Sequence, residues 1–417
     1  MKVSKVAAVA VIAIASNLAH AEASLTLDQA IRLAMTRNER AAIAKLDVTI
    51  AEAELANART AFLPVVDASG NAAYRPRADP ELSAEAAVAL TQPIFAPSAF
   101  PLHSQAKHLL AGQRARSAED HRRLAFDTAN AFVAVLLADQ VMQAAQRKLE
   151  TATVNLQQTD AQVQAQLVSS NDVTRAKISL ASANRELAAS KGNLDAAYLD
   201  LELLINQKVA SVTAPASLLV AGQAEIKTSD DLIAQSIGRR ADLMASKELA
   251  RAARDFAREP RMRYLPAFEL GAQLSAATGD GDTFDALIAV SARWTLWDSG
   301  GRAAETRARD ARARIADLET AQLARSIENE VRAAAALLSS RQLALVAAGD
   351  ARDAARKGAT EASILYKQGL AKAIELVDAN DQRFIAEVNH ATSEFDVARA
   401  YLALRLAMGL EPLEVTP

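Results

Sequence analysis

Heptad spacing is the clearest pattern of apolar and polar positions along this chain. Between residues 173 and 201 an apolar residue recurs at every seventh position, and small residues follow four of them three positions later. A second stretch, from Phe384 to Leu402, steps by four and three in the same way. This spacing predicts long helices that pack closely in coiled coils. The first seam consists of Val173, Leu180, Leu187, Leu194 and Leu201, with Ala176, Ala183, Ser190 and Ala197.

The pattern occurs twice. When the sequence is shifted by about 202 residues, AFLPVVDASG (61–70) meets RYLPAFELGA (263–272). In the same shift AYLDLELLIN (197–206) meets AYLALRLAMG (400–409), one residue out of step. Because the same elements recur in the same order, we predict two similar halves, 22–206 and 229–409. A linker at 207–228 joins them, and a tail at 410–417 follows.

Each half is predicted to hold a short helix, a pair of strands, a long helix, a break and a second short helix. The helices are expected at about 26–62, 102–165 and 171–206, and again at about 230–262, 301–367 and 373–408. At about 1.5 Å per residue, the first long helix measures roughly 95 Å and its two short partners roughly 54 Å each. Two short helices placed end to end match one long helix, which predicts a long cylinder wall instead of a compact globule.

The strand segments are expected at 65–74, 85–95, 267–276 and 285–297. Each has ten to thirteen residues, a length that suits a tilted strand crossing a membrane. Apolar and polar residues alternate along the third segment, and aromatic residues gather in or beside all four, as in an interfacial belt. The candidate belt residues are Tyr74, Phe95, Phe268, Trp294 and Trp297. The alternation alone also fits a small soluble sheet packed on the helices.

Four strands are too few to close a barrel, because small barrels need about eight. An open sheet edge in lipid would leave backbone hydrogen-bonding groups unsatisfied. The fold class we predict is therefore mainly α with a transmembrane β part. In it, three copies combine a coiled-coil α-barrel with a 12-stranded β-barrel.

Composition narrows the class of protein. The 417 residues carry a net charge of −3 and no cysteine. Without a basic face a nucleic-acid partner is not expected, and without cysteine there is no disulfide, thiolate zinc site or lipidated N-terminal cysteine. Residues 1–21 have a basic start, a short apolar run and Ala19-His20-Ala21, which fit a secretory signal peptide better than a short buried helix.

Candidate chemistry is sparse. The histidines after the signal peptide, at 103, 108, 121 and 390, lack metal-binding spacing, and TGDGDTFD (278–285) fits a hairpin loop better than a calcium loop. No nucleophile, phosphate-binding or dinucleotide motif is present. We therefore expect no metal, no cofactor and no enzymatic activity.

Several short motifs resemble those of TolC-type outer-membrane efflux proteins, in order over essentially the whole mature chain. They are LTLDQAIRLAMTRN (25–38), FLP (62–64), YLP (264–266), TQPIF (91–95), TLWDSGG (295–301) and YKQGLAKAIELVDA (366–379). The resemblance implies a homotrimer, with a β-barrel in the outer membrane of a Gram-negative bacterium and a periplasmic α-barrel. It also implies an exit duct that works with a periplasmic adaptor and an inner-membrane transporter of the RND or ABC type.

The resemblance also assigns the two helix breaks to the periplasmic tip. At the second break Tyr366, Lys372, Glu375 and Asp378 fall at positions of the gate that closes the entrance. Glu375 and Asp378 share one helix face, so three copies would place six carboxylates around the axis. Adaptor docking is expected at the two turns, at Gln166, Leu167, Val168, Gly369 and Leu370.

Two departures and one alternative remain. Ala371 occupies a place that is often basic in the family, so Lys372 is the nearest candidate latch partner, and Leu167 is taken to occupy a place where glycine is usual. An acidic pair on a solvated helix face is also common without any gating role. The competing class is a periplasmic coiled-coil scaffold or adaptor without a pore, which explains the signal peptide and the heptads but not four membrane-length strands.

Overall fold

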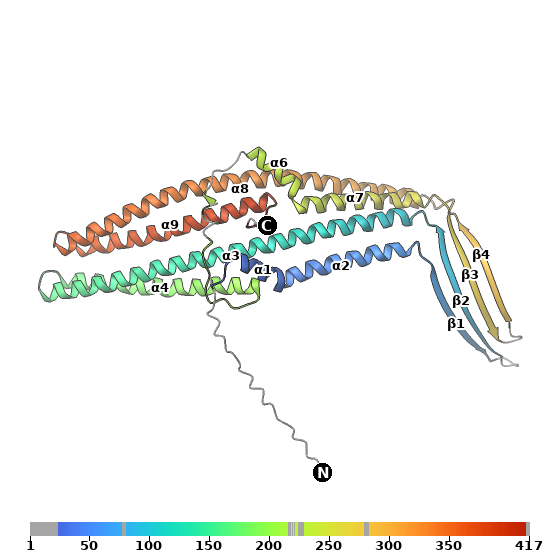
Figure 1. Ribbon diagram of the computed structural model, residues 1–417, viewed down its shortest axis with the longest axis horizontal. Helices are drawn as coiled ribbons and strands as arrows, with labels where there is room; N and C mark the ends of the chain where they lie inside the picture. The colour runs from blue at the N-terminus through green and yellow to red at the C-terminus, as the bar shows by residue number, and fades with distance from the viewer. Residues whose placement is uncertain are drawn as a thin grey trace, which may run out of the picture.

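The computed structural model describes residues 24–76, 81–215, 218, 220, 222–223, 229–278 and 283–413. It is a long helical molecule with an antiparallel four-stranded sheet at one end (Figure 1). The predicted signal peptide, the loop at 279–282 and the last four residues of the tail lie outside the described residues, as does part of the linker.

The two halves contain matching elements. In the first half these are α1 (Leu27–Arg37), α2 (Glu39–Thr60), β1 (Val65–Arg75), β2 (Glu81–Phe95), α3 (Ala99–Gln164) and α4 (Ser170–Ile205). In the second half they are α6 (Ser229–Arg239), α7 (Ala241–Met262), β3 (Ala267–Thr278), β4 (Thr283–Arg293), α8 (Gly301–Lys367) and α9 (Ala373–Ala407). From α1 to the start of α8, each element of the second half begins 202 residues after its counterpart. The predicted fold class and internal repeat are confirmed.

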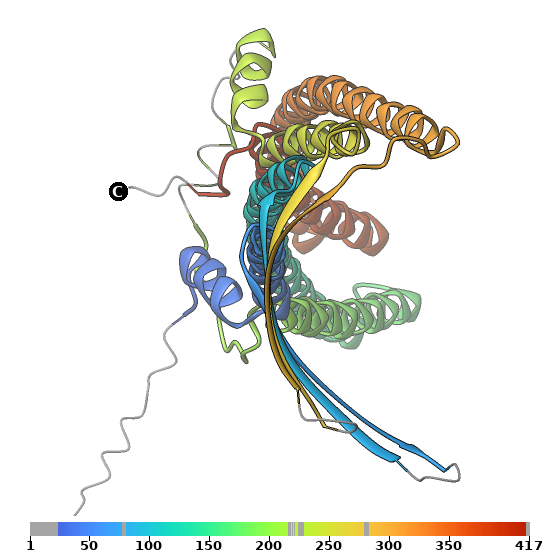
Figure 2. The same cartoon turned by 90° about the vertical axis from the view of Figure 1, so that its right-hand side faces the viewer.

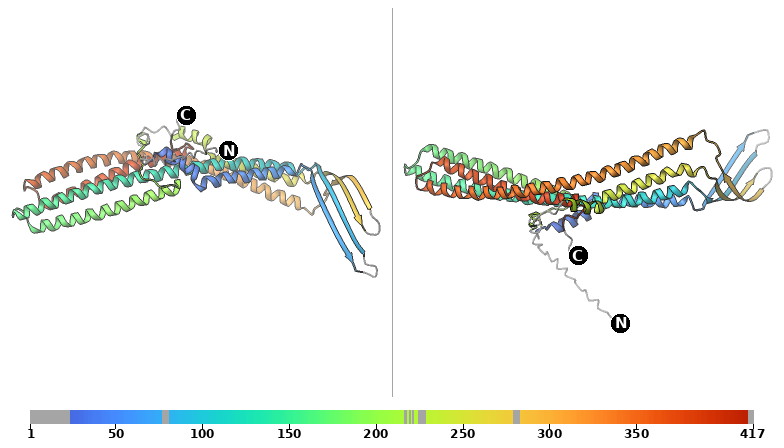
Figure 3. Two further views of the ribbon diagram at one scale, coloured as in Figure 1. Left: turned by 60° about the horizontal axis from the view of Figure 1, so that its bottom comes forward. Right: turned by 90° about the horizontal axis from the view of Figure 1, so that it is seen from above.

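The helices and strands form one curved wall. Beside the sheet the helices follow the order α2, α3, α7, α8, and in the other half of the length the order is α4, α3, α9, α8. The strands follow in the order β1, β2, β3, β4. Seen end on, the wall bends like an open arc (Figure 2), and α1 and α6 lie on one of its faces near mid-length (Figure 3).

The hydrophobic core lies at mid-length, where elements of each half converge. One cluster is built around Leu27, Phe126, Phe132, Leu201 and Phe395, which join α1, α3, α4 and α9. A second, around residues of α6 to α9, occupies the matching place in the second half. Away from these clusters the wall is one layer thick, so its helices keep long exposed faces.

Two predicted helices are each divided into two. The segment expected at 26–62 breaks at Asn38, and the segment expected at 230–262 breaks at Arg240. Both residues have extended backbone and begin the following helix. Asn38 accepts a hydrogen bond from the backbone N–H of Arg40, as an N-cap residue does. Arg240 has no such signal, because its side chain binds groups from elsewhere in the fold.

The fourth strand is shorter at its end than expected. Arg293 is its last paired residue and lies opposite Ala267, so Trp294 and Trp297 follow the strand instead of belonging to it. The next partner in register would be Pro266, which has no N–H to donate to the ladder. Trp294 instead donates its indole N–H to the carbonyl of Tyr264 at 3.0 Å.

Candidate functional site

The sheet has one apolar face and one polar face. Across its four strands the register aligns Val66 with Leu90, Leu90 with Ala272, and Ala272 with Ile288. The residues two positions along continue this apolar face, while acids and amides such as Glu269 point the other way. None of the described helices covers either face, because the sheet extends past the helical ends (Figure 1). This arrangement differs from a soluble sheet packed on helices and fits a wall between lipid and water.

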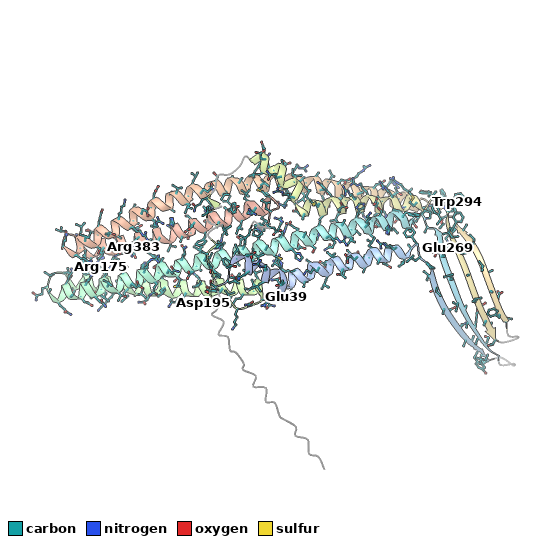
Figure 4. The ribbon with its side chains drawn as sticks, in the orientation of Figure 1. Glu39, Arg175, Asp195, Glu269, Trp294 and Arg383 are labelled. Atoms are coloured by element: carbon teal, nitrogen blue, oxygen red, sulfur yellow. The ribbon has the colours of Figure 1, made fainter. Side chains whose placement is uncertain are left out.

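Aromatic side chains mark two levels of this sheet. Phe95 and Phe268 lie near its helical end with ring centroids 6.5 Å apart. Trp294 lies at the same end, near Glu269 (Figure 4). Tyr74 lies near the far end of β1 and is 63% exposed. The nine residue steps from Val65 to Tyr74 span about 30 Å at 3.3 Å per residue, comparable with the hydrocarbon thickness of a bilayer.

The opposite end of the molecule consists of two helix turns with the same backbone geometry. After α8, Gly369 has φ of +74°, and the N–H of Leu370 donates to the carbonyl of Leu365 at 2.9 Å. After α3, Gln166 has φ of +59°, and the N–H of Leu167 donates to the carbonyl of Gln162 at 2.9 Å. Both are Schellman turns, in which a left-handed residue satisfies the last helical carbonyls.

This geometry corrects which residue of the first turn occupies the position where glycine is usual. Gln166, and not Leu167, is the counterpart of Gly369, because it holds the left-handed conformation. Leu167 corresponds to Leu370, and the two side chains are 74% and 72% exposed. Sequence spacing alone could not fix this register, because the backbone conformation of a glutamine is not visible in a residue pattern.

The second turn presents its acids to solvent. Lys372 has extended backbone at the start of α9, and its carbonyl accepts the N–H of Glu375 at 3.0 Å. Glu375 and Asp378 are both exposed on the first turns of α9. Neither acid pairs with Lys372 among the described residues, so the protomer alone holds no latch of that kind.

The sequence model of the outer membrane efflux protein family matches residues 30–207 and 232–410. The chain belongs to this family. Its members are channels that serve as outer-membrane exit ducts of efflux systems, with a large periplasmic helical part, and they are not enzymes. They are trimeric and work with adaptors and inner-membrane transporters. The scaffold alternative is therefore set aside.

Solved structures of outer-membrane channels are similar to this efflux protein. The Campylobacter jejuni channel CmeC matches with a TM-score of 0.79 and 16% identity, covering 93% of this chain and 87% of that one. The open-state MtrE channel of Neisseria gonorrhoeae matches with a TM-score of 0.79 and 19% identity, over 93% and 90%. The Vibrio cholerae protein VceC matches with a TM-score of 0.79 and 15% identity, over 93% and 97%. None of the curated protein sequences is significantly similar to the chain.

In this efflux protein Tyr366 lies inside the wall. Its side chain is buried against Ala373 and Leu376, and its hydroxyl lies 3.1 Å from the Thr159 hydroxyl on α3. Thr159 donates its own proton to the carbonyl of Asn155 at 2.8 Å. Tyr366 is therefore the donor in this contact, which joins the second helical hairpin, α8 and α9, to the first, α3 and α4.

A buried lysine makes a second connection between the hairpins, and no sequence pattern predicted this contact. Lys148 of α3 lies 2.8 Å from Glu186 of α4 and 2.9 Å from Asp381 of α9, with the ring of Phe384 4.6 Å away. Burial by itself lowers the pKa of Lys148, but its hydrogen bonds to the two carboxylates outweigh this and raise the pKa. The residue therefore stays charged. These four residues are called the Lys148 cluster below.

Further polar contacts join α3 to α9 beside this cluster. Arg147 lies 3.3 Å from Glu387, and Arg383 donates to the Thr151 hydroxyl at 3.2 Å. Figure 4 places Arg383 on the tip side of the two hairpins. The two residues in each of these contacts are far apart in sequence, and only the antiparallel packing of α3 and α9 brings them together.

Proposed function

We propose that three copies of this chain form a passive exit duct through the outer membrane of a Gram-negative bacterium. The observation that carries the proposal is the two-faced, uncovered sheet, which has free edges at β1 and β4. A free edge in lipid leaves backbone groups unsatisfied, and closure with two further copies removes every edge. Twelve strands enclose a lumen lined by the polar face.

The proposed gate is the acidic ring at the periplasmic tip. Exposed Glu375 and Asp378 from three copies place six carboxylates around a narrow axis, where they attract cations and repel one another. Tyr366 acts in the gate from inside the wall, by tying α8 to α3 through Thr159. Lys372 is exposed, and in the proposed gate it pairs with an acid of the ring on a neighbouring copy.

The proposed partners bind at the same end. The two turns form the docking surface for a periplasmic adaptor, at exposed Gln166, Leu167, Gly369 and Leu370 and at half-buried Val168. The adaptor connects the duct to an inner-membrane transporter of the RND or ABC type. Transport through the duct needs no cofactor, metal or enzymatic step, because the transporter supplies the energy.

Single-channel conductance in planar bilayers tests the gate. Wild type should give a small, cation-preferring pore, and the Glu375→Gln/Asp378→Asn variant should give a larger conductance with weaker cation preference. The matched control, Glu375→Asp/Asp378→Glu, keeps the charge and should resemble wild type.

The outcomes separate the parts of the proposal. Equal cation and anion permeability of the wild-type pore would count against the acidic ring. A pore that is identical in the neutral variant would keep the duct but remove these acids from the gate. Folded trimers that never conduct would refute the duct itself.

A further inference from the structure

The two lateral edges of the wall carry exposed helix faces in the half beside the sheet. Beside the sheet, α2 packs on α3 at one margin and α8 packs on α7 at the other (Figure 1). Each edge helix therefore has a second side that packs on no other described helix in this half of the wall. The residues on these two sides differ sharply in charge.

The free face of α2 is apolar and acidic. Ile43, Leu46 and Ile50 are 55%, 61% and 57% exposed, and they recur at spacings of three and four. Asp47 and Glu54 lie on the same face by helical spacing, and neither forms an ion pair with a described residue. The same is true of Glu39 at the start of α2, which Figure 4 places on the lower margin.

The free face of α8 is apolar and basic. Ile315 and Leu318 are 54% and 69% exposed. Arg307, Arg314 and Arg325 fall on the same face, at spacings of seven and eleven residues, which bring a helical residue back to the same side. All three are exposed and form no ion pair within the described parts of the chain.

The positions of these charges match when both helices are counted from the sheet. α2 runs toward the sheet and ends at Thr60, whereas α8 runs away from the sheet and begins at Gly301. Glu54 and Arg307 each lie six residues from those ends, and Asp47 and Arg314 each lie thirteen residues from them. At 1.5 Å per residue the two pairs sit at about 9 Å and about 20 Å along the helices.

The apolar residues match in the same register. Leu46 and Ile315 are each fourteen residues from the helix ends. Ile43 and Leu318 are each seventeen residues from them. Two antiparallel helices in this register would bury an apolar seam and place opposite charges next to it.

We infer that α2 of one protomer packs antiparallel against α8 of the next, and that this contact sets the register of the assembled wall. The inference rests on the proposed duct and names the faces by which its copies recognise one another. The seam consists of Leu46 with Ile315 and Ile43 with Leu318, and the ion pairs are Asp47 with Arg314 and Glu54 with Arg307.

The charges on the two edge helices explain why each packs against the unlike edge of a second copy. Two α2 faces would oppose acids to acids, and two α8 faces would oppose arginines to arginines, which is repulsive. Only unlike edges fit together, so the interface is heterologous. Because the wall is curved, repeated contacts of this kind close into a ring.

Cysteine cross-linking tests the register directly, because the chain contains no cysteine of its own. Leu46→Cys combined with Ile315→Cys should form disulfides under mild oxidation and give covalent trimers on non-reducing gels. Ile43→Cys with Leu318→Cys should do the same. The matched control, Leu46→Cys with Gln322→Cys, moves the second thiol seven residues, or about 10 Å, along α8 and should remain uncrosslinked.

Charge reversal provides an independent readout. Asp47→Arg should lower the temperature at which the trimer dissociates in detergent, and Arg314→Asp in the same chain should restore most of the loss. Arg312→Asp is the matched control, because Arg312 is also exposed and pairs with no described acid, but lies on another side of α8. It should give no rescue.

The experiments distinguish a failure of the inferred interface from a failure of the proposed duct. If native mass spectrometry shows trimers but both thiol pairs stay reduced, or if Arg314→Asp fails to rescue, the inferred interface is wrong and the duct still stands. If the wild-type protein is a stable monomer in detergent and lipid, the proposed function fails together with the inference.

Discussion

Asn38 and Arg240 occupy equivalent positions in the two halves, and each donates a hydrogen bond to the last turn of the final helix of its own half. The Asn38 amide donates to the carbonyl of Leu204 at 2.9 Å, and the Arg240 guanidinium donates to the carbonyl of Ala407 at 3.1 Å. Carbonyls in a last helical turn have no partner within the helix. In each half, one residue thus lies between two consecutive helices and also caps the C-terminal end of a third helix.

We expect Arg240→Met to destabilise the protein more than Asn38→Ala does. Arg240 is buried and also binds Asp242 and Glu330, so its removal leaves Asp242 without its charge partner, at a cost of about 3 kcal/mol. Loss of the Asn38 cap costs about 1 kcal/mol. Thermal unfolding followed by circular dichroism should rank the melting temperatures as wild type, Asn38→Ala, Arg240→Met. The reverse order of the two variants would show that Arg240 contributes less to stability than Asn38 does.

The repeat made much of this fold predictable, because paired motifs at a constant offset locate helices, strands and turns together. The alternation of apolar and polar residues in the strands was visible in the sequence, because one face of the sheet is apolar and the other is polar. Neither helix break was predicted: Asn38 is of a residue type that favours N-caps, whereas the break at Arg240 depends on contacts with α8 and α9. Lys148 was missed for the same reason, since a lysine within a long predicted helix looks like any solvated residue.

The tip illustrates the same limit at the candidate site. Gly369 was recognisable because glycine favours the left-handed conformation, and Gln166 was not because its conformation is imposed by the turn. We expect Gln166→Gly to stabilise this turn by up to about 1 kcal/mol, because a non-glycine residue in that region is strained. Hydrogen exchange should slow at the amide of Leu167, which bonds to Gln162. Unchanged or faster exchange would show that the turn is not strained.

His390 should make stability depend on pH. Burial lowers its pKa, and the nearby charge of Arg352 lowers it further. Arg352 donates to the ring at 3.2 Å, which requires a neutral nitrogen. A depressed histidine pKa contributes stability above the unfolded value near 6.5, and this is lost as the pH falls through the folded value.

The measurement is the melting temperature between pH 7.5 and 5. Wild type should lose more stability over this range than His390→Asn, which keeps a polar side chain but does not titrate. Parallel curves for the two proteins would contradict the assignment. Arg352→Met should raise the pKa of His390 toward its unfolded value, so this variant should lose less stability than wild type over the same pH range.

The Lys148 cluster should hold the two hairpins together. Lys148→Met removes the charge that Glu186 and Asp381 share, and leaves these two carboxylates close together and repelling each other across α4 and α9. If the hairpins separate when the duct opens, this variant should conduct several-fold more than wild type in planar bilayers. Lys177→Met is the matched control, because Lys177 is exposed on α4, forms no ion pair with described residues and should leave conductance unchanged. The expected gain should disappear when Glu186→Gln and Asp381→Asn are added, because the repulsion is then gone. Equal conductance of Lys148→Met and wild type would mean that opening does not separate α9 from α3 at this level.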